Sequence, residues 1–164
     1  MTKLAIIGGT GLNQINGLKI TATQQLETPF GSPSAAYIHG IVNGKEIIFL
    51  ARHGNPHTIP PHKINYRANI WGLKELGATE IIAIAAVGGI TPVMNPAHIA
   101  LPDQVIDYSY GREHTFFTDN LETVTHIDFT FPYNKQLRTR LIQAAKIANL
   151  SVSITGAYGC IQGP

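Results

Sequence analysis

The sequence predicts an α/β protein built on a mixed central sheet flanked by helices. Three observations lead to this fold class. They are an apolar run that enters a glycine-rich turn at 4–11, an Asn-Gly turn between two β-prone runs at 37–51, and a strand–helix–strand succession whose helix and second strand lie at 65–87. A tight hairpin pairs its strands antiparallel, whereas a helical crossover pairs them parallel, so together these signals predict a mixed sheet.

The first 50 residues are predicted to be mainly strand. Residues 4–7 form a continuous apolar run, typical of a buried strand, and Gly8-Gly9-Thr10-Gly11 follows as a tight turn. Residues 37–42 and 46–51 are joined through Asn43-Gly44, which is the strongest short signal for a β-hairpin.

The next segment predicts a helix followed by a second buried strand. Asn65 is a typical N-cap and Gly77 a typical C-terminal stop. The apolar residues between them lie at helical spacing: Ala68, Ile70, Trp71, Leu73 and Leu76. Residues 81–87 are all apolar and are halted by Gly88-Gly89, so they predict the strand that completes a parallel crossover.

The last third of the chain predicts two more β segments around a second helix. Residues 105–108 are typical of a short strand, and 152–158 are again β-like. Asn134 caps the helix between them, and five residues share one of its faces: Leu137, Leu141, Ala144, Ala145 and Ala148. With 164 residues and no linker, 1–164 is interpreted as a single domain.

Composition excludes several classes of protein. Charged residues are 13% of the chain, about half the roughly 25% of a typical domain, and hydrophobic residues are 44%, which excludes disorder. A net charge of +2 is too small for a nucleic-acid-binding face, so no nucleic-acid partner is expected. The single cysteine, Cys160, and a four-residue apolar run too short for a signal peptide favour a cytoplasmic protein with no membrane partner.

The glycine-rich turn is the first candidate site. Backbone N–H groups of Gly8-Gly9-Thr10-Gly11 and the Thr10 hydroxyl could converge on an anion, although an ordinary tight turn would have the same sequence. A dinucleotide fingerprint needs glycine at position 14, where this chain has Gln14. This disfavours a nicotinamide-dependent oxidoreductase.

The second candidate site is Arg52-His53, directly after the predicted strand at 46–51. Arg52 offers a planar fork of donors that suits phosphate, and His53 can hydrogen-bond or share a proton with it. The alternative is a solvated loop with incidental histidines. A metal site at His53, His57 and His62 is disfavoured, because neighbouring prolines prevent a helix and no carboxylate lies in the cluster.

Two further segments could contribute. The small residues at 85–89 end a predicted strand where a ligand could approach the backbone, although plain strand packing explains them equally. The segments 111–117 and 126–129 mix charges with aromatic residues, which is typical of an interface loop or an exposed turn. Together the strand ends predict an anion site beside an apolar pocket.

The motifs occur, in order along the whole chain, in a pattern that resembles the trimeric purine nucleoside phosphorylase and methylthioadenosine phosphorylase family. The segments that carry the resemblance are 7–12, 27–31, 50–54, 65–69, 86–89 and 156–164. Further details at 56–62, 106–115 and 126–129 are most like the bacterial S-methyl-5'-thioinosine phosphorylase branch.

The resemblance implies a nucleoside phosphorylase-like fold and reversible phosphorolysis, in which phosphate attacks a purine nucleoside and releases the base. It assigns phosphate binding to Thr10, Arg52, His53 and Ala86. It assigns nucleoside binding to Ile161 and to His126, which would reach the 5' end of the substrate in a neighbouring subunit of a homotrimer. Phosphate is then a co-substrate, and no cofactor or metal is expected.

Two departures from the family pattern qualify this expectation. The family usually has a hydroxyl residue where this chain has Ala85, so one phosphate contact is expected to be missing or replaced. Family members also continue past the equivalent of Gly163-Pro164, so we expect the C-terminal part with the base pocket to be lacking. The catalytic residue that polarises the purine is therefore unknown. The alternatives are a methylthioadenosine phosphorylase and a truncated, non-catalytic fragment that binds nucleoside or phosphate.

Overall fold

The computed structural model describes residues 3–9, 15–119 and 121–162. The chain forms two compact units. The first comprises residues 1–86 with 111–116, and the second comprises 87–110 with 117–164. Each unit is described by itself.

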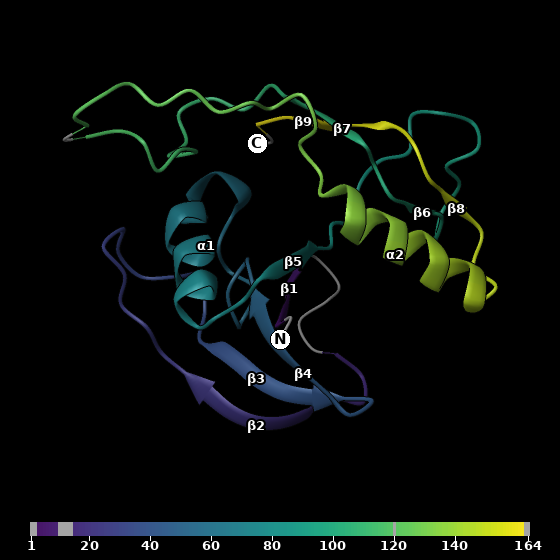
Figure 1. Cartoon of the computed structure of the whole chain (residues 1–164), viewed down its shortest axis with the longest axis horizontal. Helices are drawn as coiled ribbons and strands as arrows, with labels where there is room; N and C mark the ends of the chain where they lie inside the picture. The colour runs from purple at the N-terminus through teal and green to yellow at the C-terminus, as the bar shows by residue number, and fades with distance from the viewer. Residues whose placement is uncertain (1–2, 10–14, 120, 163–164) are drawn as a thin grey trace. The chain divides into compact units, whose positions relative to one another are not determined.

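The first unit contains a five-stranded sheet in the order β2-β3-β4-β1-β5 (Figure 1). The strands are β1 (Leu4–Gly8), β2 (Lys19–Gln24), β3 (Tyr37–Val42), β4 (Lys45–Ala51) and β5 (Glu80–Ala83). β1 pairs parallel with β4 and β5, whereas β3 pairs antiparallel with β2 and β4. The predicted mixed sheet is confirmed.

The hairpin between β3 and β4 forms where the sequence predicts it. Asn43 and Gly44 have φ angles of 49° and 73°. A two-residue turn that follows the strand twist requires positive φ at both positions, and Asn-Gly meets this requirement at low cost. The register Val42↔Lys45 confirms the two-residue loop.

Helix α1 (Tyr66–Glu75) packs on one face of this sheet. The Asn65 side chain accepts a hydrogen bond from the Ala68 N–H at 3.0 Å, and Gly77 follows the helix with a φ of 84°, so both predicted ends are confirmed. A short 3-10 helix, η1 (Pro61–Lys63), precedes α1. The buried core between helix and sheet consists of Ala5, Ile7, Tyr37, Ile48, Leu50 and Leu73.

The predicted strand at 81–87 is wrong in its second half, because β5 ends at Ala83. Its partner β1 ends at Gly8, and the last bond of the ladder runs from the Ile84 N–H to the Ile7 carbonyl at 2.9 Å. Among the described residues no partner strand continues beyond that bond, and residues 84–86 leave the sheet and are exposed.

The second unit contains helix α2 (Lys135–Ile147) and two small parallel sheets. One sheet pairs β6 (Ile99–Ala100) with β8 (Val152–Ser153), and the other pairs β7 (Gln104–Asp107) with β9 (Ala157–Cys160). The β segment predicted at 152–158 therefore forms two strands. The strand conformation is interrupted before β9, where Gly156 has a φ of 141°. The sequence does not single out β2, which has no continuous apolar run, or β6, which is only two residues long.

Helix α2 begins after Asn134, whose side chain accepts from the Leu137 N–H at 2.8 Å, as the sequence predicts. Its buried side is narrower than predicted. Ala145 is buried and Leu137 and Leu141 are partly buried, but Ala144 and Ala148 are exposed. Alanine adds little apolar area, so these two positions do not decide which side of the helix packs.

Candidate functional site

The carboxyl ends of three parallel strands meet at one edge of the first unit's sheet. β1, β4 and β5 are neighbours in the sheet and end at Gly8, Ala51 and Ala83. The segments that leave these ends contain Gly9, Arg52 and Ile84 respectively. This edge is where open α/β sheets bind ligands. Three of the candidate segments predicted from the sequence therefore converge here.

The Arg52 guanidinium lies across this edge. Its Nη1 donates a hydrogen bond to the Ile84 carbonyl at 2.9 Å, and its Nε donates to His53 Nε2 at 3.3 Å. Gly9 lies directly beneath the guanidinium, because a Cβ built at this position would overlap the Arg52 side chain and stand 2.7 Å from the Ile84 oxygen. The Arg52 guanidinium is thus held where the three strands end. Its remaining N–H groups are donors of the kind that can bind an anion.

His53 fixes the orientation of Arg52. His53 is 7% exposed, and its ring Nδ1 lies 2.9 Å from the Ile59 carbonyl oxygen. A carbonyl oxygen only accepts, so Nδ1 carries the proton and Nε2 is the acceptor for Arg52. The His57 ring stacks on the His53 ring, with 4.4 Å between ring centroids. Both ring nitrogens of His53 are thereby engaged within the protein.

The loop that carries His53, residues 53–61, folds back on the histidine backbone. The N–H groups of Thr58 and Ile59 both donate to the His53 carbonyl, at 3.0 and 2.9 Å. Gly54 adopts a φ of 82°, which a residue with a side chain would adopt only under strain. The sharp turn after β4 brings the Ile59 carbonyl back to the ring of His53.

The other predicted phosphate ligands have different placements. Thr10 lies outside the described residues. Ala86 is exposed and follows β5 by three residues in the same unit as Arg52, and Ala85 precedes it. Its backbone belongs to the segment whose Ile84 carbonyl accepts from Arg52.

The two predicted nucleoside contacts belong to the second unit. His126 is exposed in the irregular segment between β7 and α2. Ile161 directly follows β9 and is 71% exposed. The residues that contact Arg52 in the structure belong to the first unit.

No group of three or more His, Cys, Asp or Glu side chains in the described part of the chain could hold a metal ion. His53 already uses both ring nitrogens, and His57 and His62 are exposed. Across residues 3–9, 15–119 and 121–162, no helix is long and apolar enough to cross a membrane.

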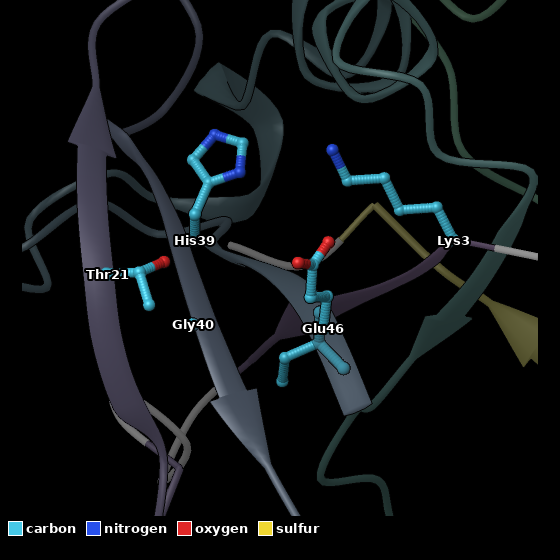
Figure 2. Close-up of a pocket in the computed structure, with 6 residues that line it drawn as sticks. Lys3, Thr21, His39, Gly40 and Glu46 are labelled. Carbon is cyan, nitrogen blue, oxygen red and sulfur yellow. The ribbon is translucent and has the colours of Figure 1, made fainter. Parts of the chain in front are cut away.

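A small hollow lies near the opposite edge of the same sheet, where β1 and β4 begin (Figure 2). Lys3, His39 and Glu46 line it, and the Lys3 ammonium donates to the Leu76 carbonyl at the end of α1 at 2.8 Å. Burial lowers the pKa of His39 below its usual value, the Lys3 charge lowers it further, and Glu46 opposes the shift. None of the residues that line this hollow belongs to the contacts around Arg52.

Sequence reasoning missed the roles of Gly9 and the Ile84 carbonyl in holding Arg52. The sequence predicts Gly9 as part of a tight turn that could bind an anion, without a role in placing Arg52. The signal that could have shown this is the position of Gly9 directly after β1, which pairs with both β4 and β5. Only a residue without a side chain leaves room there for Arg52, which follows β4.

Comparison with known proteins agrees with this fold. Residues 3–164 match the family described as the phosphorylase superfamily. The probable S-methyl-5'-thioinosine phosphorylase of Pseudomonas syringae pv. tomato is 52% identical over 164 residues, which cover 100% of this chain and 67% of that protein. The 6-oxopurine nucleoside phosphorylase of Pyrococcus furiosus is 42% identical over 170 residues, which cover 100% of this chain and 63% of that protein.

A solved structure gives the same result. Methylthioadenosine phosphorylase from Schistosoma mansoni in complex with adenine aligns with a TM-score of 0.95 and 34% identity, over 100% of this chain and 63% of the other. The chain therefore has the α/β fold of nucleoside phosphorylases. It spans about two thirds of the length of the relatives it matches.

Proposed function

This chain belongs to the phosphorylase superfamily, and we propose that the complete protein catalyses the phosphorolysis of purine nucleosides in purine salvage. The proposed reaction converts S-methyl-5'-thioinosine and phosphate into hypoxanthine and 5-methylthioribose 1-phosphate. The observation that carries the proposal is the Arg52 guanidinium, held across Gly9 at the ends of β1, β4 and β5. Sequence similarity to the P. syringae protein favours the methylthioinosine substrate.

The chemistry explains why a fixed arginine is needed. Phosphate attacks the anomeric carbon while the bond to the purine nitrogen breaks and its electron pair goes to the base. The sugar becomes cationic in the transition state, so an anionic nucleophile held close to it stabilises the charge. A guanidinium that is already oriented avoids reorganisation during the reaction, which is the main advantage of an electrostatically preorganised site.

We assign the phosphate contacts as follows. Arg52 supplies charged donors, and His53 supports it by accepting from its Nε. Direct contact between the His53 ring and phosphate would require Nε2 to exchange Arg52 for the anion. Thr10 and the Ala86 backbone complete the site. Phosphate is a co-substrate, and no cofactor takes part.

The proposal extends to assembly and compartment. Ile161 would pack on the nucleoside, and His126 would reach the 5' group of a substrate bound to a neighbouring subunit in a homotrimer. Both residues are exposed, as a contact with substrate or with another chain requires. A single cysteine fits a reducing, cytoplasmic location.

The test is phosphate-dependent release of hypoxanthine by the complete protein. Initial rates on methylthioinosine, methylthioadenosine and inosine identify the substrate. Since discrimination by an apolar pocket is worth only about 10- to 200-fold per methylene, inosine should be a weaker substrate rather than an inert one. A clear preference for methylthioadenosine would contradict the substrate assignment and would support methylthioadenosine phosphorylase activity instead. Nucleoside or phosphate binding without turnover would support a non-catalytic binding protein.

The phosphate site is tested by Arg52→Ala, which should raise the KM for phosphate strongly, and by Arg52→Lys, which keeps the charge but loses the fork. Lys63→Ala is the matched control, because it removes one exposed positive charge from the nearby η1. An unchanged phosphate dependence in Arg52→Ala would overturn the site assignment.

A further inference from the structure

The 53–61 loop is held at a second point beyond His53. The Tyr66 hydroxyl donates a hydrogen bond to the Pro61 carbonyl at 2.9 Å. Pro61 lies two residues after Ile59, whose carbonyl accepts from His53 Nδ1 at 2.9 Å. The short segment that orients the His53 ring is therefore fixed by the histidine at one end and by Tyr66 at the other.

Tyr66 is in turn held by an arginine from a distant part of the sequence. Nη1 of Arg112 donates to the Tyr66 hydroxyl oxygen at 3.1 Å, and the Arg112 guanidinium carbon lies 5.8 Å from the centre of the Tyr66 ring. The hydroxyl therefore accepts from a cation and donates to a carbonyl. A donor that accepts a charge-assisted hydrogen bond becomes a stronger donor itself.

The 111–116 segment that carries Arg112 has its own anchors on the first unit. Glu113 pairs with Arg67 at 2.8 Å, and the Phe116 ring meets the Phe30 ring edge-on at a centroid distance of 5.3 Å. The Arg67 guanidinium also lies 5.1 Å from the centre of the Phe30 ring. Of these contacts, only the Arg112–Tyr66 bond leads on to the loop that carries His53.

We infer that Tyr66, held by Arg112, is a positioning residue for phosphate. The contacts form a continuous series in which Arg112 orients the Tyr66 hydroxyl, Tyr66 fixes the 59–61 backbone, that backbone orients His53, and His53 holds the Nε of Arg52. Neither Tyr66 nor Arg112 needs to touch substrate. The inference rests on the proposed function, because it takes Arg52 as the group that binds phosphate.

The experiment measures KM for phosphate, KM for nucleoside and kcat in the complete protein. Tyr66→Phe keeps the ring and removes the hydroxyl, and Arg112→Gln removes the cation. Each should raise the KM for phosphate about five-fold, as expected for one lost hydrogen bond, with kcat and the nucleoside KM nearly unchanged. Glu113→Gln is the matched control: it weakens an exposed ion pair of the same segment and should leave all three constants unchanged.

Two further readouts separate positioning from a merely structural role. If Arg112 acts through the Tyr66 hydroxyl, the double variant should be no worse than Tyr66→Phe alone. Nitrogen NMR of the His53 ring should show the Nδ1-protonated tautomer losing population in Tyr66→Phe, because the Ile59 carbonyl is less firmly placed.

Other results would overturn the inference. An unchanged phosphate KM in Tyr66→Phe, with phosphate dependence lost in Arg52→Ala, would overturn it while leaving the proposed function intact. A loss in Glu113→Gln equal to that in Arg112→Gln would show that the whole 111–116 segment acts, without a specific role for Tyr66. If Arg52→Ala itself keeps normal phosphate dependence, the proposed function fails first.

Discussion

At the scale of single residues, the candidate site depends on the close approach of the Arg52 side chain to the backbone at Gly9 and Ile84. Gly9 lies under the Arg52 guanidinium, and the Ile84 carbonyl lies beside both. The backbone at Ile84 cannot move far without disturbing the end of β5, whereas the arginine side chain can. A side chain at position 9 would therefore displace Arg52 first.

Gly9→Ala should raise the KM for phosphate by about tenfold to a hundredfold, because small displacements of a binding group cost that much in a preorganised site. Steady-state kinetics with varied phosphate measure the effect. Gly159→Ala is the control, since a Cβ at Gly159 meets no atom within 4 Å. Equal effects of the two substitutions would contradict the role given to Gly9.

His39 provides a pH-dependent contribution to stability. Its pKa is lowered in the folded protein, first by burial and then by Lys3, against the opposing effect of Glu46 (Figure 2). The folded state therefore binds fewer protons than the unfolded state between the lowered pKa and the usual value of 6.5. Stability rises with pH across that window and is lost as the pH falls through it.

His39→Gln should flatten this dependence. The free energy of unfolding, measured by urea titration between about pH 5 and 7.5, should fall less on acidification in the variant than in the parent. Glu46→Gln should make stability depend more steeply on pH, because Glu46 favours the protonated imidazole and its loss lowers the pKa of His39 further. A parallel pH profile for parent and His39→Gln would rule out this contribution.

At the scale of elements, α1 is held to the sheet by Tyr37 of β3. The Tyr37 hydroxyl donates to the carbonyls of Ala68 and Asn69 at 3.1 and 3.2 Å, and burial raises the pKa of Tyr37 to about 12, so the hydroxyl remains a donor. Gly72 makes room for the ring. A Cβ there would stand 2.6 Å from the Tyr37 Cζ.

Gly72→Ala should destabilise the protein even though alanine is favoured over glycine in a helix by about 1 kcal/mol. Overpacking against Tyr37 should cost about 1–3 kcal/mol, which exceeds that gain. Denaturant unfolding measures the net loss. In a Tyr37→Phe background the cost of Gly72→Ala should shrink, since the hydroxyl is the nearest obstacle. A stabilised single variant would contradict the close packing.

At the scale of the whole molecule, the proposed trimer accounts for apolar side chains that the second unit leaves exposed. Phe129 and Phe131 are 63% and 86% exposed in the segment that also contains His126. Aromatic residues are enriched in interface cores, so a neighbouring chain would cover them in a closed ring. Low overall charge points in the same direction.

The complete protein should have the mass of a trimer in solution, measured by light scattering. At low phosphate, mixed oligomers of His126→Ala and Arg52→Ala chains should be more active than either variant alone, because some sites then combine an intact Arg52 with an intact His126 from the neighbour. A fully active monomer would exclude the shared site. A trimer without complementation would place His126 outside the neighbour's site.

The sequence by itself determined the elements whose signals are local. The Asn43-Gly44 hairpin, the caps at Asn65 and Asn134, and the stop at Gly77 depend on backbone preferences that act within a few residues. The mixed sheet followed from the order of these elements. The sequence predicts Arg52 and His53 as site residues because they directly follow an apolar run that is recognisable as a strand.

Only the tertiary structure decided where β5 ends and what surrounds Arg52. A strand continues only as far as its partner, so the end of β1 at Gly8 stopped β5 at Ala83 although the apolar run continues. The contacts of Arg52 with Ile84 and of Tyr66 with Arg112 join residues 32 and 46 positions apart. Such contacts depend on how the packed strands and loops meet in space, and no local pattern of residues specifies them.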